Sequence, residues 1–406
     1  MRKRQVFRGT YKTSDFCYSL FSGSSLYFFC ECLDHDVLPT LIDKNKHCPG
    51  IETPDKQFYY WLKRIRYVEE TMTSKDLGVQ RHYFAMIKNR PLYNKILWPV
   101  DIVEVSSDIL NLEGKAMTVS RHHDARDDSN KVDVSDMALV FPYEDRFQAF
   151  RYTAQDIVNY YNDPDNQLVP DEEKLTYKNP VIRKLIVEIV RAIKGIYDAG
   201  YVYYDFSLPR FSIDNTGTQS TIFLDFTNLV FGIEELYRAD DYSELMIEEP
   251  KEIEPDFADP FFMAYDEMII PDEQTFLFSL CSLLFFLMFG RNAYSGGISQ
   301  ESDATLLQHY RIAMDRLKEP YFIFDEDEKN NINRLGIISA DTAVIDLFEN
   351  APAQLKSMFI RTLSYKNAKR INDNLYAPSL KEWLDFFESS GWISESNKTI
   401  LTVPEN

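Results

Sequence analysis

Two aspartates, Asp205 and Asp225, have the residue type and spacing that best fit catalysis in this sequence. Asp205 stands in Y-V-Y-Y-D-F-S-L-P-R-F-S-I-D (201–214), and Asp225 stands in L-D-F-T-N. Each follows an apolar or aromatic run, so each is expected where a short strand ends. One carboxylate can accept the proton of an attacking hydroxyl group, and the other can bind Mg²⁺, which prefers oxygen ligands. The pair fits phosphoryl transfer, whereas either residue alone also fits a strand-end aspartate in solvent.

The elements around the two aspartates are predicted to bring them together. A long helix is predicted over 180–200, since Pro180 lies in its first turn and Gly200 follows its last. Its apolar positions fall on one face: Ile182, Leu185, Ile189, Ile193 and Ile196. Between the aspartates, N-T-G-T-Q-S (215–220) predicts a hairpin between two short strands. This order places both carboxylates in one cleft.

The whole chain separates into a strand-rich first part and a helical second part. Strand patterns occupy 18–33 (two strands around a turn), 57–65, 96–105 and 137–143. Helical patterns in the second part include 275–290, 354–364 and 378–387. A chain of 406 residues is too long for one simple core. We therefore predict an α+β, bilobal architecture with a strand-rich N-lobe over 1–143 and a mostly helical C-lobe over 144–406.

The two aspartate motifs resemble those of protein kinases. Tyr203-Tyr204-Asp205 stands where that family has His-Arg-Asp, and L-D-F-T (224–227) resembles the Asp-Phe-Gly metal motif. The resemblance implies that Asp205 is the catalytic base and that Asp225 binds Mg²⁺. ATP would be the phosphoryl donor.

Three later segments resemble the same family, in the same order. Residues 259–267 resemble the end of the activation segment, and 276–294 resemble the central buried helix of the large lobe. Residues 360–371 resemble the closing segment, which implies that Arg370 pairs with Asp266. The resemblance covers 180–390 and is to divergent stand-alone kinases found in bacteria.

The first part of the chain matches this family less well. Ser22–Ser25 stands where the glycine-rich phosphate loop is expected, with Gly23 as its one glycine. Lys63 resembles the strand lysine that grips the α- and β-phosphates. The glutamate that holds this lysine in the family has no clear counterpart, and Gln80 lies nearest the expected distance.

Several family positions in the second part are also changed. Arg210 stands where a second metal-binding asparagine is usual, and a guanidinium has no acceptor for Mg²⁺. One metal then suffices, or Arg210 itself neutralises phosphate charge, or catalysis is weak. The alternative is a surface arginine that contacts the acidic segment 244–256. The family's paired histidine and aspartate become Tyr203 and Phe276, which predicts a joint apolar repacking.

Three functions remain open from the sequence. The first is an ATP-dependent protein Ser/Thr kinase. The second is a pseudokinase that acts as a binding or regulatory module, because Arg210 and the glycine-poor loop depart from the active pattern. The third is a small-molecule kinase of the aminoglycoside or choline type, which shares the paired aspartate motifs. The partner is accordingly a protein substrate or a regulatory protein in the first two cases.

Charge and composition exclude other classes. The formal net charge is −20, which argues against a nucleic-acid or anionic-membrane surface. The apolar run over 275–290 is shorter than the roughly 20 residues that span a bilayer. No apolar segment follows the basic start M-R-K-R-Q-V-F-R, so a cytoplasmic protein is expected.

A zinc site is a separate hypothesis for the first part of the chain. Five residues able to bind zinc lie close in sequence: Cys30, Cys32, His35, His47 and Cys48. Two cysteines spaced i, i+2 on a strand share a face. The alternative is ordinary strand cysteines beside a polar loop.

Overall fold

The computed structural model divides the chain into two units, Met1–Ala149 and Phe150–Asn406, and each is described by itself. The sequence-based prediction placed this boundary between 143 and 144. The described residues are 6–8, 17–23, 27–32, 59–65, 98, 101–105, 136–142, 153–163, 174–204, 206–214, 221–224, 230–232, 255–263, 272–295, 313–327, 342–371, 377–399 and 401.

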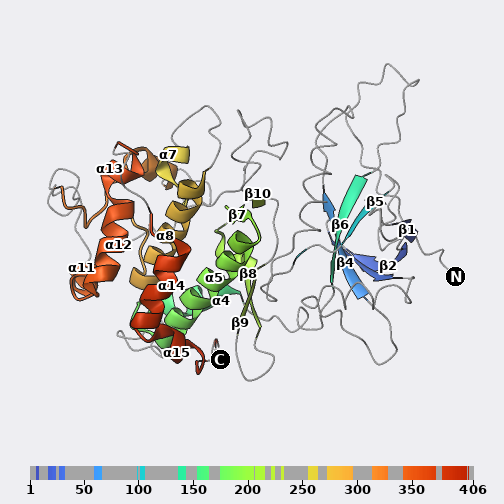
Figure 1. The fold of residues 1–406 in the computed structure, drawn as a ribbon, viewed down its shortest axis with the longest axis horizontal. Helices are drawn as coiled ribbons and strands as arrows, with labels where there is room; N and C mark the ends of the chain where they lie inside the picture. Colours follow the sequence, from blue (N-terminus) through green and yellow to red (C-terminus); the bar gives the residue numbers. More distant parts are fainter. Residues whose placement is uncertain are drawn as a thin grey trace, which may run out of the picture. The chain divides into compact units, whose positions relative to one another are not determined.

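The first unit contains a six-stranded sheet in which every neighbouring pair is antiparallel (Figure 1). Its strands are β1 Val6–Arg8, β2 Cys17–Gly23, β3 Tyr27–Cys32, β4 Tyr59–Ile65, β5 Asp101–Val105 and β6 Asp136–Pro142, in the spatial order β1-β2-β3-β4-β6-β5. Strands β2 to β6 overlap the segments that the sequence predicted to be extended, and β1 was not predicted.

Helix α5, Pro180–Asp198, opens the part of the second unit that leads to the two aspartates. The side chain of Asn179 accepts hydrogen bonds from the N–H groups of Val181 and Ile182, which caps the helix start. Gly200 follows the helix end with φ +88°, a left-handed conformation that favours glycine. The predicted helix and its end at Gly200 are confirmed.

Helix α8, Glu273–Phe289, is the apolar helix predicted to be buried on all sides. Every residue in it except Glu273, Gln274 and Phe286 is buried. Among the described residues, none of the helices combines the length and the apolar character that crossing a membrane requires. The prediction of a buried helix inside a large unit is confirmed.

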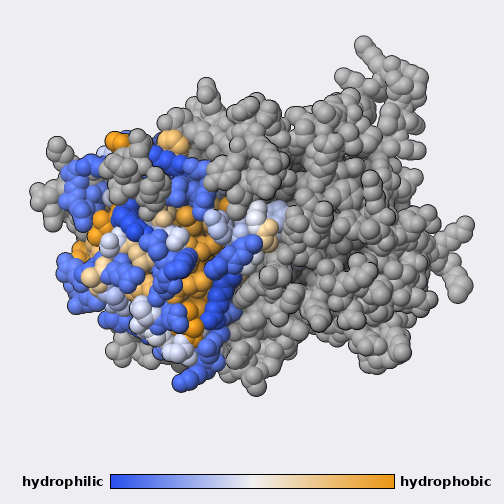
Figure 2. Space-filling view, in the orientation of Figure 1, coloured by the Kyte–Doolittle hydropathy of each residue, from blue (hydrophilic) through white to orange (hydrophobic). Residues whose placement is uncertain are grey.

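The other helices in the described part of the second unit are α4 Ala154–Asn162, α7 Pro260–Met263, α11 Thr342–Glu349, α12 Ala353–Leu363, α13 Tyr365–Ala368, α14 Leu380–Ser389 and α15 Trp392–Ser396. Helices α14 and α15 contact α5, while α11 and α12 contact α8. Aromatic rings fill the space beside α8, where Phe285 contacts both Phe322 and Phe359. On the face in Figure 2, hydrophilic residues surround a narrower hydrophobic band.

Candidate functional site

Two short antiparallel strand pairs frame the segment with the predicted catalytic residues. Strand β7, Tyr201–Tyr203, pairs with β10, Val230–Gly232, and places Tyr203 opposite Val230. The 3-10 helix η2, Leu208–Arg210, leads into β8, Phe211–Asp214. Strand β8 pairs with β9, Thr221–Leu224, in register Phe211 to Leu224. The predicted pairing of the two strands between the aspartates is confirmed.

Asp205 and Asp225 themselves lie outside the described residues, but their chain neighbours are described. Leu224 directly precedes Asp225 and is paired with Phe211. The ring of Phe211 lies 6.4 Å from the ring of Tyr203, which is two residues before Asp205. Phe211 thus links Tyr203, which lies shortly before Asp205, to Leu224, which directly precedes Asp225.

The first unit holds the two predicted nucleotide-binding positions on nearby strands. Gly23 ends β2 and is paired with Phe28 of β3, and Phe28 is paired in turn with Leu62 of β4. Lys63 therefore lies one residue beyond the position on β4 that is level with Gly23. The strands β2 and β4 are separated by two strand spacings, about 10 Å. The structure describes the backbone of Lys63 in β4 and of Arg210 in η2, but it does not describe their side chains.

An aromatic cluster surrounds the residues on either side of Asp205 in the sequence. Tyr203, Phe206 and Phe276 are each at most 1% exposed. Phe206 contacts Tyr203 edge-on at 5.6 Å between ring centroids and stacks on Phe276 at 6.0 Å. Tyr197 of α5 also stacks on Phe276, at 6.0 Å between ring centroids. Positions 203 and 276, which the sequence predicted to be repacked together, are both buried in one aromatic cluster, and Phe206 is the ring that joins them.

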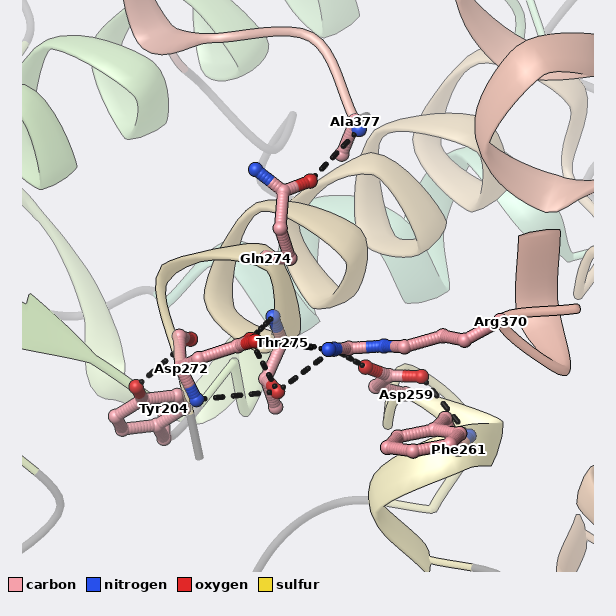
Figure 3. A network of polar contacts seen from close by, with 8 residues as sticks. All are labelled: Tyr204, Asp259, Phe261, Asp272, Gln274, Thr275, Arg370 and Ala377. Carbon is pink, nitrogen blue, oxygen red and sulfur yellow. Dashed lines mark hydrogen bonds and ion pairs between the residues drawn. The ribbon is translucent and has the colours of Figure 1, made fainter. Parts of the chain in front are cut away.

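A polar network lies at the start of α8 (Figure 3). Arg370 donates to Asp272 at 2.8 Å, to Asp259 at 2.7 Å and to the hydroxyl of Thr275 at 3.0 Å. Its guanidinium also lies 4.7 Å from the ring centroid of Phe261, a cation–π distance. The predicted partner of Arg370, Asp266, lies outside the described residues, and the described partners are Asp259 and Asp272.

Tyr204 connects this network to the segment that contains Asp205. Its hydroxyl donates to the main-chain oxygen of Asp272 at 3.0 Å, as Figure 3 shows. Asp272 is the N-cap of α8, and its carboxylate accepts from the N–H of Thr275 at 2.7 Å. The residue before Asp205 is therefore bonded to the first turn of the central helix.

The two carboxylates that share Arg370 have opposite pKa shifts. Asp259 is 1% exposed, and burial raises its pKa to about 6 even though Arg370 favours the ionised form. Partial burial would also raise the pKa of Asp272, but the hydrogen bonds and charge of Arg370 outweigh burial and lower it. Burial disfavours the charged guanidinium of Arg370, yet both carboxylates together raise its pKa. Asp272 thus stays ionised beside Arg370 to lower pH than Asp259 does, and Asp259 is the carboxylate whose protonation changes near pH 6.

The backbone of Arg370 has a conformation that the sequence did not reveal. It has φ +49°, and it directly follows the short helix α13 and Lys369. Ile371 donates its N–H to the carbonyl of Lys366 at 2.8 Å, which closes the helix end in the manner usual for glycine. An arginine here gives no turn signal, so sequence reasoning found its charge but not its geometry, and it missed Tyr204, Asp259 and Asp272.

The zinc hypothesis is not tested by the described residues. Cys30 and Cys32 lie two residues apart on β3, which places them on one strand face. His35, His47 and Cys48 lie outside the described residues. Within the ranges that the structure describes, no group of three or more potential metal ligands occurs.

Comparison with known proteins shows a resemblance at the level of three-dimensional structure. No protein-family model matches the sequence, and no curated protein matches it either. Among solved structures, the chain is similar to ROP2 from Toxoplasma gondii, described as a virulence factor with a protein-kinase fold and no enzymatic activity. The two share 11% sequence identity at a TM-score of 0.43, over 97% of this chain and 87% of that chain.

Proposed function

We propose that this chain has a bilobal protein-kinase-like fold and transfers the γ-phosphate of Mg-ATP to a serine or threonine hydroxyl of a protein. The observation that supports this function is that Phe211 links the two segments that lead into the paired aspartates. Tyr203 contacts Phe211, and Phe211 is paired with Leu224. In phosphoryl transfer, a protein mostly positions the reactants and neutralises charge, so two acidic groups held in one region are the central requirement.

The proposed roles follow from the chemistry of each side chain. Asp205 accepts the proton of the attacking hydroxyl group, and Asp225 offers carboxylate oxygens of the kind that Mg²⁺ binds. Lys63 would grip the α- and β-phosphates, and Gly23 would allow the backbone to approach them. Arg210 does not fit a metal site because it has no acceptor atom, so we assign it to phosphate charge. When bound, ATP would supply the phosphoryl group that is transferred, and Mg²⁺ would neutralise part of the phosphate charge.

A radiolabelled-ATP assay on the full chain tests this proposal. With Mg²⁺ or Mn²⁺ and a mixed set of protein substrates, we expect phosphate on Ser or Thr. Asp205→Asn and Asp225→Asn should each lower the rate at least about 100-fold, because each removes a charge at the reacting centre. Asp385→Asn is the matched control, since Asp385 pairs with Lys381 on an exposed part of α14 and should leave the rate unchanged. Transfer that survives Asp225→Asn would contradict the mechanism.

A second candidate is a pseudokinase that serves as a binding or regulatory module. It is favoured by Arg210 in place of a metal-binding asparagine and by Gly23 as the one glycine of the phosphate-loop segment. Thermal-shift titrations with ATP, with and without Mg²⁺, separate the candidates. A kinase should show a Mg²⁺-dependent rise in Tm, whereas a module that binds no nucleotide should show none.

The variant Arg210→Asn gives a sharper comparison of the two candidates. It restores the side chain that protein kinases use for a second metal. If Arg210 neutralises phosphate charge in an active enzyme, the variant should lower kcat. If Arg210 instead blocks a second metal in a weakened enzyme, the same variant should raise it.

A further inference from the structure

The side chain next to the proposed catalytic base is bonded to the central helix. Tyr204 directly precedes Asp205 and is 3% exposed. Its hydroxyl donates to the main-chain oxygen of Asp272 at 3.0 Å, as Figure 3 shows. A main-chain acceptor moves only if the helix start moves, so the rigidity of this contact depends on how Asp272 is held.

Asp272 is held from two directions. On the helix side, its carboxylate accepts from the N–H of Thr275 at 2.7 Å, while the hydroxyl of Thr275 accepts from the N–H of Asp272 at 3.3 Å. On the other side, Arg370 donates to the same carboxylate at 2.8 Å. Charge-assisted hydrogen bonds of this kind are among the stronger polar contacts in proteins. The acceptor for Tyr204 is therefore part of a cross-linked helix end.

The residue on the other side of Asp205 is attached to the same helix turn. Phe206 is 1% exposed, and its ring stacks on Phe276 at 6.0 Å. Phe276 and Asp272 are four residues apart, so they lie one helical turn from each other. The N–H of Phe206 also donates to the carbonyl of Tyr204 at 3.2 Å. Both chain neighbours of Asp205 are thus docked on the start of α8, one through a polar contact and one through an apolar contact.

We propose that Tyr204 is a positioning residue, whose hydroxyl bond to the carbonyl of Asp272 fixes the segment that presents Asp205 to substrate. The inference rests on the proposed kinase function for its effect on catalysis. Since a misplacement of about 1 Å can cost a reaction up to 100-fold, one neighbouring hydrogen bond can matter for the rate. In this arrangement Arg370 acts on the loop through Asp272.

The test compares two Tyr→Phe variants of the full chain. Tyr204→Phe removes the hydroxyl and keeps the ring. Tyr177→Phe is the matched control, because Tyr177 is also buried (6% exposed) and its hydroxyl also donates to a main-chain oxygen, that of Asn350 at 3.2 Å. Hydrogen–deuterium exchange of a peptide over 201–210 reports whether the segment is held, and kcat and KM report whether holding it matters.

For Tyr204→Phe we expect exchange in 201–210 to rise about fivefold, the factor for losing one ordinary hydrogen bond. We expect kcat to fall about tenfold and the KM for ATP to change less than twofold. In an Asp205→Asn background, Tyr204→Phe should lower the residual rate no further, because its effect passes through Asp205. Tyr177→Phe should leave the 201–210 peptide and kcat unchanged.

Unchanged exchange in Tyr204→Phe would overturn the inference, as would an equal change in Tyr177→Phe. A kcat that stays constant while exchange rises would also overturn it, because Tyr204 would then be structural only. If the wild-type chain transfers no phosphate at all, the proposed function fails. A rise in exchange confined to Tyr204→Phe would still support the docking of the segment on α8 in that case.

Discussion

Arg370 lies 2.7 Å from a carboxylate oxygen of Asp259, whose side chain is 1% exposed. This contact joins the segment that precedes α8 to the segment that follows α13, 111 residues further along the chain. Removing one partner of a buried pair leaves the other charge without compensation, which is more costly than losing an exposed pair. The relation between these two residues therefore predicts a strong and pH-dependent effect of substitution.

Arg370→Gln should lower the free energy of unfolding by about 3 kcal/mol at pH 7.5, because Asp259 would remain buried without its cation. Chemical denaturation monitored by circular dichroism measures this change. The control is Lys194→Gln, which breaks the exposed pair of Lys194 with Asp198 and should cost about 0.5 kcal/mol or less. At pH 5 the penalty of Arg370→Gln should shrink, because Asp259 can then bind a proton. An equal loss of unfolding free energy in both variants would show that the pair of Arg370 with Asp259 contributes no more to stability than an exposed pair.

Asp259 should also give the folded protein a distinct pH dependence. Its pKa is raised from an ordinary 3.8 to about 6 by burial, so between these values the folded state binds more protons than the unfolded state. Its contribution to stability is therefore fully present at low pH, and it falls as pH rises from about 4 to about 6, by on the order of 2 to 3 kcal/mol.

Asp259→Asn should remove this slope, since the amide keeps an acceptor for Arg370 but does not titrate in this range. The measurement is the difference in unfolding free energy between wild type and Asp259→Asn at several pH values. The wild type should lose stability relative to the variant across the window from pH 4 to 6. A difference that stays flat, or that has the opposite slope, would contradict the raised pKa.

The fold was more predictable from the sequence than the network around Arg370. Helices α5 and α8 have strong local signals, namely Pro180 at a helix start, Gly200 after a helix end and a predominantly apolar run. Arg370 was found as a charge through its resemblance to a family position. Its partners were not found, because Asp259 and Asp272 contact it across 111 and 98 residues, and no local pattern encodes such a contact.

The aromatic cluster at α8 was predicted in part, because two positions were considered together. The sequence placed Tyr203 and Phe276 together because both replace polar residues that are neighbours in protein kinases. It did not identify Phe206, which lies between them and contacts both rings. Many phenylalanines in a sequence can be buried, and the sequence does not tell which rings each one contacts. The role of Phe206 is therefore visible only in the structure.

Phe276→Asp should be strongly destabilising, although the resemblance to protein kinases implies an aspartate at this position. Phe276 is fully buried and contacts the rings of Tyr197 and Phe206, so a carboxylate would replace ring contacts without a matched partner. We expect a loss of about 4 kcal/mol or more in unfolding free energy. Phe276→Leu, which stays apolar, should lose about 1 to 2 kcal/mol. Denaturation of both variants measures the difference, and a well-tolerated aspartate would show that the polar arrangement remains available to this chain.

Gly290 ends α8, and its replacement should be more costly than that of a comparable glycine elsewhere. It has φ +68°, and a Cβ added there would lie 3.3 Å from the carbonyl oxygen of Leu175. Gly200 has φ +88° and would meet nothing within 4 Å. Both changes to alanine should cost about 1 kcal/mol for the left-handed backbone, and Gly290→Ala should add a further penalty because a main-chain oxygen must shift. Thermal unfolding of the two variants gives the comparison. A Tm for Gly290→Ala equal to or above that of Gly200→Ala would show that the contact of the helix end with Leu175 is loose.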